Sequence, residues 1–312
     1  MKRLFIIILV AYGIFSFLMI VFSKEQVNQI IILTQKQIYS RLITDNETLD
    51  INIFVSSNKS FILDKSLISY AKLKSENEEL SVDIKKIELV DKDISYKQQN
   101  YYQYLIKIDF SDTLISNYTL NMFDCLLEIT YQNNDSINLE IGDLSLDFQS
   151  ITGSNHIDFT HLFGVTEIIE QKNYLMAIAL KLDNLSNQNI FLKNIYTNTN
   201  HININTFDGV LLKEDEIRSQ SFFVMFKDFD NIKNIYSDPK EILLNDDFYL
   251  VLPLEYSFNL KQINRFPIFI EYIYNNQEYC YVIDDYIFFS ERIILNEDDE
   301  RIREFIYQYQ ES

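Results

Sequence analysis

Glycine and proline are scarce in this chain of 312 residues, which has 5 glycines and 3 prolines. Average usage of about 7% and 5% would give roughly 22 glycines and 16 prolines. A P-loop and a dinucleotide-binding fingerprint both depend on glycine-rich loops, so the sequence excludes both. The turns must instead come from Asn, Asp and Ser, whose side chains hydrogen-bond to nearby backbone groups.

Basic residues are also few, because 27 Lys and Arg stand against 46 Asp and Glu and give a formal charge of -19. Nucleic acids are bound through basic patches that displace counterions, so the sequence predicts no nucleic-acid partner. Anionic lipid headgroups would repel the polar part of the chain for the same reason. Divalent cations and basic protein surfaces stay compatible with this charge, although a solvated acidic surface explains it more simply.

Histidine occurs three times, which leaves little material for acid–base chemistry. The sequence contains no G-x-S-x-G motif, and neither Cys125 nor Cys280 has a histidine nearby. Adjacent carboxylates such as Asp246 and Asp247 fit solvated turns better than a glycosidase pair, which needs two carboxyl groups about 5–10 Å apart in a cleft. We therefore expect a protein that is not an enzyme and carries no cofactor.

The nearest approach to a metal-binding motif is HIDFTH, which contains His156, Asp158 and His161. In a strand, His156 and Asp158 would share one face and His161 would fall on the other. These three residues are weak metal-site candidates, and a polar linker exposed to water is the simpler interpretation.

A long apolar run from Leu4 to Phe22 follows Lys2 and Arg3 and contains no charge. Its nineteen residues would span about 28 Å as a helix, close to the roughly 30 Å hydrocarbon core of a bilayer. The run exceeds a typical signal-peptide core and lacks an A-x-A cleavage site, which favours an uncleaved signal anchor over a cleaved signal peptide. The lipid bilayer is thus one expected partner. The basic residues Lys2 and Arg3 before the run favour a single-pass membrane protein with a cytoplasmic N-terminus and residues 24–312 outside the cytoplasm.

Two stretches of the chain resemble each other, because EITYQNNDSINLEIGDLSLDF at 128–148 is echoed by EYIYNNQEYCYVIDDYIFF at 271–289. The resemblance extends upstream in two further segments, whose aligned first residues are Tyr104 with Tyr249 and Ile51 with Ala179. Such self-similarity indicates a tandem duplication of one β domain, and chance likeness between two hairpins is the alternative.

Alternating apolar residues, as at Ile106, Ile108 and Phe110, indicate half-buried strands, and 133–136 (NNDS) is typical of a hairpin turn without glycine. Short strands with polar turns between them predict a mainly β protein with two tandem immunoglobulin-like β-sandwich domains, although no Trp is present for an immunoglobulin core. The predicted segments are a transmembrane signal anchor at 1–23, a juxtamembrane stalk at 24–46, β-sandwich domain 1 at 47–149, a connector at 150–173, β-sandwich domain 2 at 174–290, and a C-terminal amphipathic helix at 291–312.

The two ends of the folded part have more than one interpretation. Residues 27–42 could form a juxtamembrane helix, or residues 30–33 could be an entering strand. At the other end, a cap at Asn296 and acidic residues in the first turn indicate a helix. Its apolar stripe either packs on its own domain or docks a partner, and the partner-binding candidates are Ile302, Phe305, Ile306 and Tyr309.

The cysteines fall in different predicted sandwiches, so a disulfide with its roughly 6 Å Cα separation is not expected and both thiols should be free and buried. We interpret the chain as a membrane-anchored, extracytoplasmic, non-catalytic interaction or accessory protein of a bacterial cell surface, whose partner is a membrane or surface protein. The alternative is a surface module that binds glycan or Ca²⁺. That alternative depends on the tyrosines at 96, 101, 102 and 104 and on acidic loops such as 228–231 (DFDN).

Overall fold

The computed structural model describes most of the chain after its N-terminal segment. The described residues are 28–43, 48–57, 61–110, 118–148, 156–186, 188–206, 209–219, 248–257, 260–284, 286–289 and 295–309. Within them the protein is mainly β, as predicted, and its one α-helix is the short α2 (Glu214–Ser219). Two 3₁₀ turns, η1 (Phe61–Leu63) and η2 (Lys65–Leu67), precede a strand.

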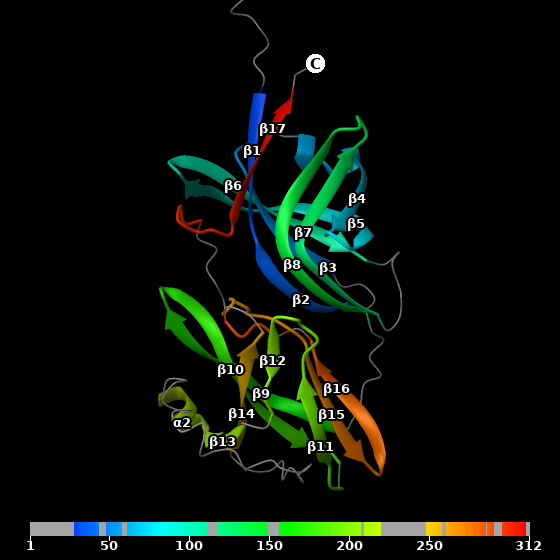
Figure 1. Ribbon diagram of the computed structural model, residues 1–312, viewed down its shortest axis with the longest axis vertical. Helices are drawn as coiled ribbons and strands as arrows, with labels where there is room; N and C mark the ends of the chain where they lie inside the picture. The colour runs from blue at the N-terminus through cyan, green and yellow to red at the C-terminus, as the bar shows by residue number, and fades with distance from the viewer. Residues whose placement is uncertain are drawn as a thin grey trace, which may run out of the picture.

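Nine strands form one continuous hydrogen-bonded path in the order β17-β1-β3-β6-β5-β4-β7-β8-β2 (Figure 1). Their bounds are β1 (Asn28–Gln35), β2 (Gln37–Ile43), β3 (Thr48–Val55), β4 (Ile68–Lys74), β5 (Glu79–Tyr96), β6 (Gln99–Asp109), β7 (Tyr118–Tyr131), β8 (Ser136–Phe148) and β17 (Ile302–Tyr309). Strand β5 pairs with β4 through its first residues and with β6 through the rest, so the path folds into two layers. We call this unit the first sandwich.

The core of the first sandwich lies between these layers and follows from strand alternation. In β3, Leu49, Ile51 and Ile53 are buried, whereas Asp50 and Asn52 between them are half-buried. The same core contains buried aliphatic residues of β6, β7 and β8. Removal of this apolar surface from water is the main driving force that holds the layers together.

Eight strands form the second sandwich, which has a five-stranded sheet and a three-stranded sheet. The first sheet has the order β12-β14-β10-β9 with β13 also paired to β14, and the second has the order β11-β15-β16. The bounds are β9 (Ile157–Ile169), β10 (Lys172–Asn184), β11 (Phe191–Tyr196), β12 (Ile202–Ile204), β13 (Val210–Lys213), β14 (Phe248–Tyr256), β15 (Ile268–Tyr274) and β16 (Gln277–Ile283). Buried residues of both sheets share one core.

The segments that resemble each other in sequence occupy equivalent strands. Strand β3 pairs antiparallel with β6, and β10 pairs antiparallel with β14. The register pairs Ile51 with Ile106 in one case and Ala179 with Val251 in the other, which are equivalent positions in the sequence alignment. The orders β1-β3-β6-β5 and β9-β10-β14-β12 match strands A-B-E-D of an immunoglobulin-like sandwich, and β4-β7-β8 and β11-β15-β16 match C-F-G.

Both hairpins in the repeated stretches turn without glycine, as the sequence predicts. Asn134 has φ 66° in the turn between β7 and β8. Asn275 and Asn276 have φ 51° and 60° between β15 and β16. Asparagine tolerates this left-handed region better than other residues with a side chain, so it replaces the usual glycine.

The predicted C-terminal helix is wrong, because residues 302–309 form strand β17, which pairs antiparallel with β1. Phe305 and Tyr307, two residues apart, pack against the core of the first sandwich, whereas Ile306 between them is 49% exposed. The apolar spacing fits both a helix and a strand, and the open edge of β1 decides between them. The four partner-binding candidates therefore do not form one apolar face, since Ile302 packs on the opposite face of the sheet from Phe305. The side chain of Tyr309 lies outside the described residues.

Residues 28–43 form β1 and β2, so the strand alternative for the juxtamembrane segment is correct and the helical one is wrong. Ile30 and Ile32 face the main core and Leu33 faces the opposite side of the sheet, as strand alternation requires. No helix in the part of the chain that the structure describes is long and apolar enough to cross a bilayer, and the predicted span from Leu4 to Phe22 lies outside that part.

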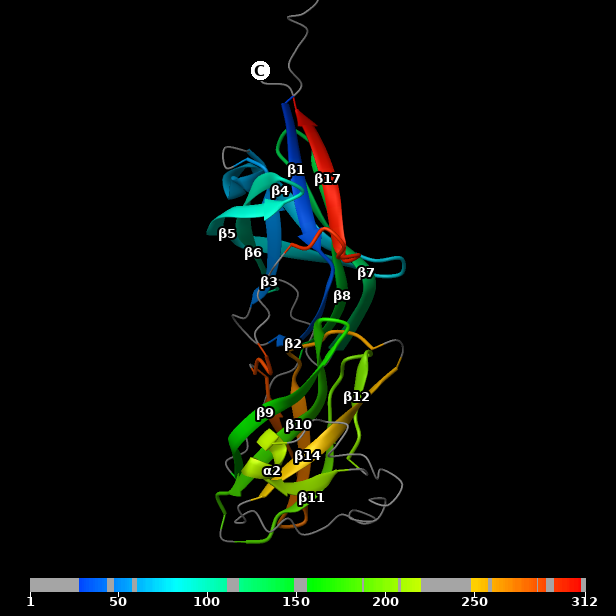
Figure 2. The same cartoon turned by 90° about the vertical axis from the view of Figure 1, so that its left-hand side faces the viewer.

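The molecule is elongated, with the first sandwich at one end and the second sandwich at the other (Figures 1 and 2). Asn28 at the start of β1 pairs with Tyr309 at the end of β17. The first and the last described strands therefore meet at the end of the molecule that is farthest from the second sandwich (Figure 1).

Candidate functional site

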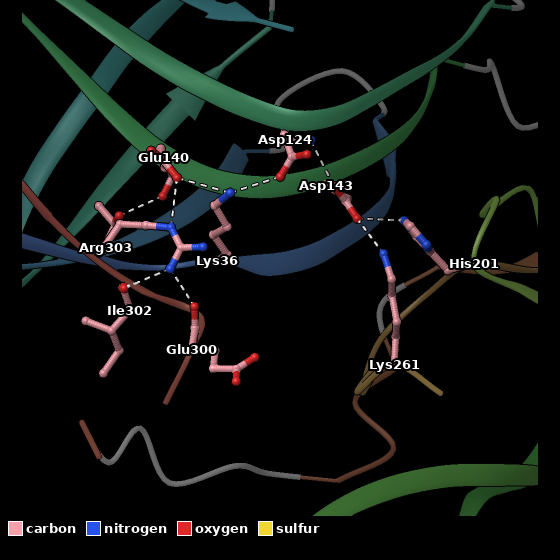
Figure 3. A network of polar contacts seen from close by, with 10 residues as sticks. Lys36, Asp124, Glu140, Asp143, His201, Lys261, Glu300, Ile302 and Arg303 are labelled. Atoms are coloured by element: carbon pink, nitrogen blue, oxygen red, sulfur yellow. Dashed lines mark hydrogen bonds and ion pairs between the residues drawn. The ribbon is translucent and has the colours of Figure 1, made fainter. Parts of the chain in front are cut away.

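A polar junction joins the two sandwiches, and its centre is Asp143 on strand β8 (Figure 3). One carboxylate oxygen of Asp143, Oδ2, lies 2.9 Å from Nζ of Lys261 and 3.3 Å from Nε2 of His201. Both partners belong to the second sandwich. The other oxygen, Oδ1, accepts the backbone N–H of Asp124 at 2.9 Å.

Gly142 lets the chain place Asp143 at this position. Its φ is +108°, and a Cβ built on it would lie 2.1 Å from the backbone oxygen of Gln37. Strand β2 pairs parallel with β8 starting at Gln37 opposite Gly142, so a side chain there would separate the two strands. Opposite, β7 has an irregular register between Met122 and Leu126, and Asp124 has φ 47° within it. This bulge turns the backbone N–H of Asp124 toward Asp143.

Lys36 extends the junction along the first sandwich (Figure 3). Its Nζ lies 2.9 Å from Oδ1 of Asp124 and 3.0 Å from Oε2 of Glu140, and Arg303 of β17 contacts the same Glu140 oxygen at 3.0 Å. The hydrogen bond from Lys36 lowers the pKa of Asp124 below its usual range. The network thus joins the chain between β1 and β2, the β7 bulge, β8 and β17.

Asp299 and Arg301 provide a second connection to the second sandwich. The Arg301 guanidinium donates to both oxygens of Asp299, and its Nη1 donates to Oε1 of Gln262 at 3.0 Å. Burial disfavours the charged form of Asp299, but the hydrogen bonds from Arg301 outweigh it and lower the pKa of Asp299 to about 2. Gln35 donates to the same carboxylate at 3.0 Å.

His201 is a deeply buried titratable group of the junction, since only 3% of it is exposed. Its Nδ1 is buried and makes no hydrogen bond to the part of the chain that the structure describes. Its ring packs against Phe123 of β7, with ring centroids 5.8 Å apart. Burial lowers the pKa of His201 below its ordinary 6.5, the Lys261 ammonium adds to this, and Asp143 acts in the opposite direction.

A buried carboxylate, Asp147, lies further along β8 and is 2% exposed. Its Oδ1 accepts the Thr119 hydroxyl at 2.6 Å, and Asn198 of the second sandwich also donates to it. Burial raises the pKa of Asp147, and these two hydrogen bonds oppose that effect. Ile38 of β2 packs against the core of the second sandwich, so the junction has an apolar contact beside its polar ones.

A cavity of about 300 Å³ opens at this junction. Four cations and two carboxylates lie in its wall: Lys36, Lys172, Lys261, Arg301, Asp124 and Asp143. The charged contacts of this junction can hold the two sandwiches in one orientation. Its titratable side chains can gain or lose protons when the pH changes. Nucleophilic chemistry by the buried thiol nearby on β7 is not supported, because burial raises the pKa of Cys125 to about 12 and keeps it protonated.

The three predicted metal ligands do not meet. His156 Nδ1 lies 3.2 Å from the Tyr272 hydroxyl, and Asp158 accepts the hydroxyl of Tyr281 at 2.8 Å. The ring of His161 instead faces Tyr249, with centroids 6.0 Å apart. Among the residues described above, no group of three or more His, Cys, Asp or Glu side chains could hold a metal ion.

The tyrosines considered for glycan binding belong to the interior. Tyr96, Tyr101 and Tyr104 are 6%, 3% and 7% exposed, and Tyr102 packs against the core of the first sandwich. The acidic stretch 228–231 lies outside the described residues. Both cysteines are free, as predicted, but only Cys125 is buried, whereas Cys280 is half-buried.

The junction residues were not predicted from the sequence. Asp143 and His201 are 58 positions apart (201 − 143), and Lys261 is a further 60 away (261 − 201). The available local signal was Gly142, because a glycine inside a strand often marks a close backbone approach.

No family model matches the chain, and no curated protein matches it. Solved structures that match include one described as "Anomalous substructure of Titin-A168169", with 10% identity and a TM-score of 0.18, covering 82% of this chain and 97% of that one. Another is described as "Marsupial T cell receptor", with 7% identity and a TM-score of 0.16, covering 83% of this chain and 96% of that one. At these TM-scores neither likeness bears on function.

Proposed function

We propose that this protein is a membrane-anchored, extracytoplasmic, non-catalytic interaction or accessory protein built from two tandem immunoglobulin-like domains. The observation that carries the proposal is the repeated strand pairing, in which two sets of strands share one order and the β3–β6 and β10–β14 pairs share one register. Many cell-surface domains use this sandwich architecture, and this step is an analogy at the level of the fold.

The positions of the two ends support the anchored arrangement. Five residues, 23–27, separate the apolar run that ends at Phe22 from Asn28, where β1 begins. With that run in a bilayer, the first sandwich lies next to the membrane and the second sandwich is held away from it. The Lys261–Asp143 ion pair and the contact between neutral His201 and Asp143 hold the second sandwich in one orientation relative to the first.

Strand β17 is the surface we propose for a membrane partner. It is the last strand of its sheet and lies beside the start of β1, close to the proposed anchor. Of the partner-binding candidates with a described side chain, only Ile306 is exposed, at 49%. An exposed strand edge with an apolar side chain is a common docking surface for another chain.

The test is crosslinking of the full-length protein in intact cells, extraction in mild detergent, and identification of partners by mass spectrometry. We expect one recurrent membrane protein that is lost with Ile306→Asp and retained with Leu211→Asp. Leu211 on β13 is a matched control because it is 50% exposed and lies in the second sandwich. Melting temperatures of both variants close to that of the wild type would exclude unfolding as the cause. A recurrent partner that both variants retain, or the absence of any recurrent partner, would contradict the proposal.

A further inference from the structure

The junction contains a histidine whose protonation the surroundings oppose. The Asp143 carboxylate accepts hydrogen bonds only, so Nε2 of His201, 3.3 Å away, carries the ring proton in the neutral form. Nδ1 then presents a lone pair to a buried site without a hydrogen-bond donor in the part of the chain that is described. A second proton would create a buried N–H with no acceptor among the described residues, and such a group loses its hydration without compensation.

The charges around His201 are nearly balanced when it is neutral. Asp143 of β8 and Lys261 of the segment before β15 form an ion pair at 2.9 Å and both face the ring. Behind them Asp124 of the β7 bulge is paired with Lys36, and Asp147 of β8 is held by Thr119 and Asn198. Protonation of His201 adds a positive charge beside the Lys261 ammonium, with which it must share the Asp143 carboxylate. Phe123, the remaining contact from β7, offers no charge.

We propose that His201 is a proton-sensitive latch between the two sandwiches, and that its protonation in mildly acidic surroundings releases the second sandwich from its fixed orientation. The sandwiches remain folded, because their cores do not include His201. The latch acts at the junction, where Lys261 and His201 are the second sandwich's contacts to Asp143. This inference goes beyond the proposed function and does not depend on which partner the protein binds.

The direction of the pH dependence follows from the lowered pKa of His201. In the unfolded or released state the pKa is near the ordinary value of about 6.5. A group with a lower pKa in the closed state contributes stability that is fully present above about pH 6.5 and is lost as the pH falls through the lower value. The junction is therefore closed at neutral pH and weakened in acid.

The experiment uses the full-length chain in detergent, with spin labels on cysteines introduced at Glu78 and Gln188, one exposed site in each sandwich, in a Cys280→Ser background. The distance distribution between the labels is compared at about pH 7.5 and about pH 5.5, a window in which histidine titrates. We expect one narrow distribution at the higher pH and a broadened or shifted one at the lower pH. His201→Gln keeps a donor for Asp143 but cannot titrate, so its distribution should not change with pH.

The chain supplies its own controls, because His156→Gln and His161→Gln should behave as the wild type does. Asp147→Asn should also keep the pH response, which separates His201 from the other buried junction group with a shifted pKa. A response that persists in His201→Gln, or a wild-type distribution independent of pH, would overturn the proposal. Should His201→Gln fail to fold, the pKa of His201 measured by NMR titration in the Lys261→Gln variant tests the proposal instead. Removal of the ammonium should raise the pKa of His201, and an unchanged or lower value would refute the latch.

Discussion

Replacement of Gly142 by alanine is expected to cost far more stability than one methyl group suggests. The φ of +108° lies outside the region that residues with a Cβ normally adopt, and such strain costs on the order of 1–3 kcal/mol. The new Cβ would also sit 2.1 Å from the Gln37 backbone oxygen and 2.6 Å from its nitrogen. Because these atoms belong to backbone, relief requires strand β2 to move away from β8.

The movement would loosen the first pairs of the parallel β2–β8 ladder, at roughly 0.5–1.5 kcal/mol for each hydrogen bond lost. Together with the strain, the expected loss is about 3–5 kcal/mol in the free energy of unfolding. Urea denaturation of the full-length protein in detergent, followed by tyrosine fluorescence and circular dichroism, measures it. The matched control is Gly209→Ala, whose Cβ would meet the Leu252 side chain at 2.8 Å and whose φ lies outside the left-handed region.

Because a side chain can yield where backbone cannot, Gly209→Ala should cost about 1–3 kcal/mol, as overpacking does. A Gly142→Ala variant as stable as the Gly209→Ala variant would refute the reasoning. It would show that β2 tolerates displacement and that Asp143 does not need this glycine to reach the junction.

Three further predictions concern single side chains. Tyr307→Phe removes the hydroxyl that donates to Asp135, so it should lower the free energy of unfolding by about 1 kcal/mol in chemical denaturation, whereas no change would show that the bond is not formed. A thiol reagent at mildly alkaline pH should modify Cys280 in the native protein and Cys125 only after unfolding, and mass spectrometry of the labelled peptides gives the order. Cys125 is buried and burial raises its pKa to about 12, whereas Cys280 is half-buried and accessible although burial raises its pKa too. The pKa of Asp299 is about 2, so its contribution to stability is present above the unfolded value of about 3.9 and lost as the pH falls through 2. Asp299→Asn should therefore lower the melting temperature at neutral pH and flatten its dependence on pH in that acid range, and an unchanged profile would contradict the assignment.

Local signals in the sequence were sufficient to predict these strands and the two hairpin turns. The alternation at Ile106, Ile108 and Phe110 predicted a half-buried strand, and the structure buries all three. The asparagines at the two turns predicted left-handed backbone without glycine, and the structure shows it. These features depend on residues a few positions apart, which periodicity and turn chemistry describe well.

Features that depend on distant partners could not be predicted in this way. The spacing of Ile302, Phe305 and Ile306 satisfies a helix, and only the open edge of β1, more than 260 positions earlier, makes the segment a strand. The contact between Asp143 and His201 has no local signature either, because each residue taken alone is an ordinary polar residue in a β segment. A glycine next to an acidic residue within a strand was the one indication of a special site.

The pairing of β1 with β17 has a consequence for biosynthesis. Asn28 and Tyr309 are 281 positions apart (309 − 28). The sheet that contains β1, the first described strand, therefore receives β17 only after all strands of the second sandwich have been synthesised. Until β17 has been synthesised, β1 presents an unpaired edge that can recruit strands from other chains. Non-local pairing of this kind also slows folding, because the long loop must close before the contact forms. A chain that ends before Ile302 would lack all eight residues of β17 and would keep that edge open permanently, which makes premature termination a cause of aggregation as well as of lost function.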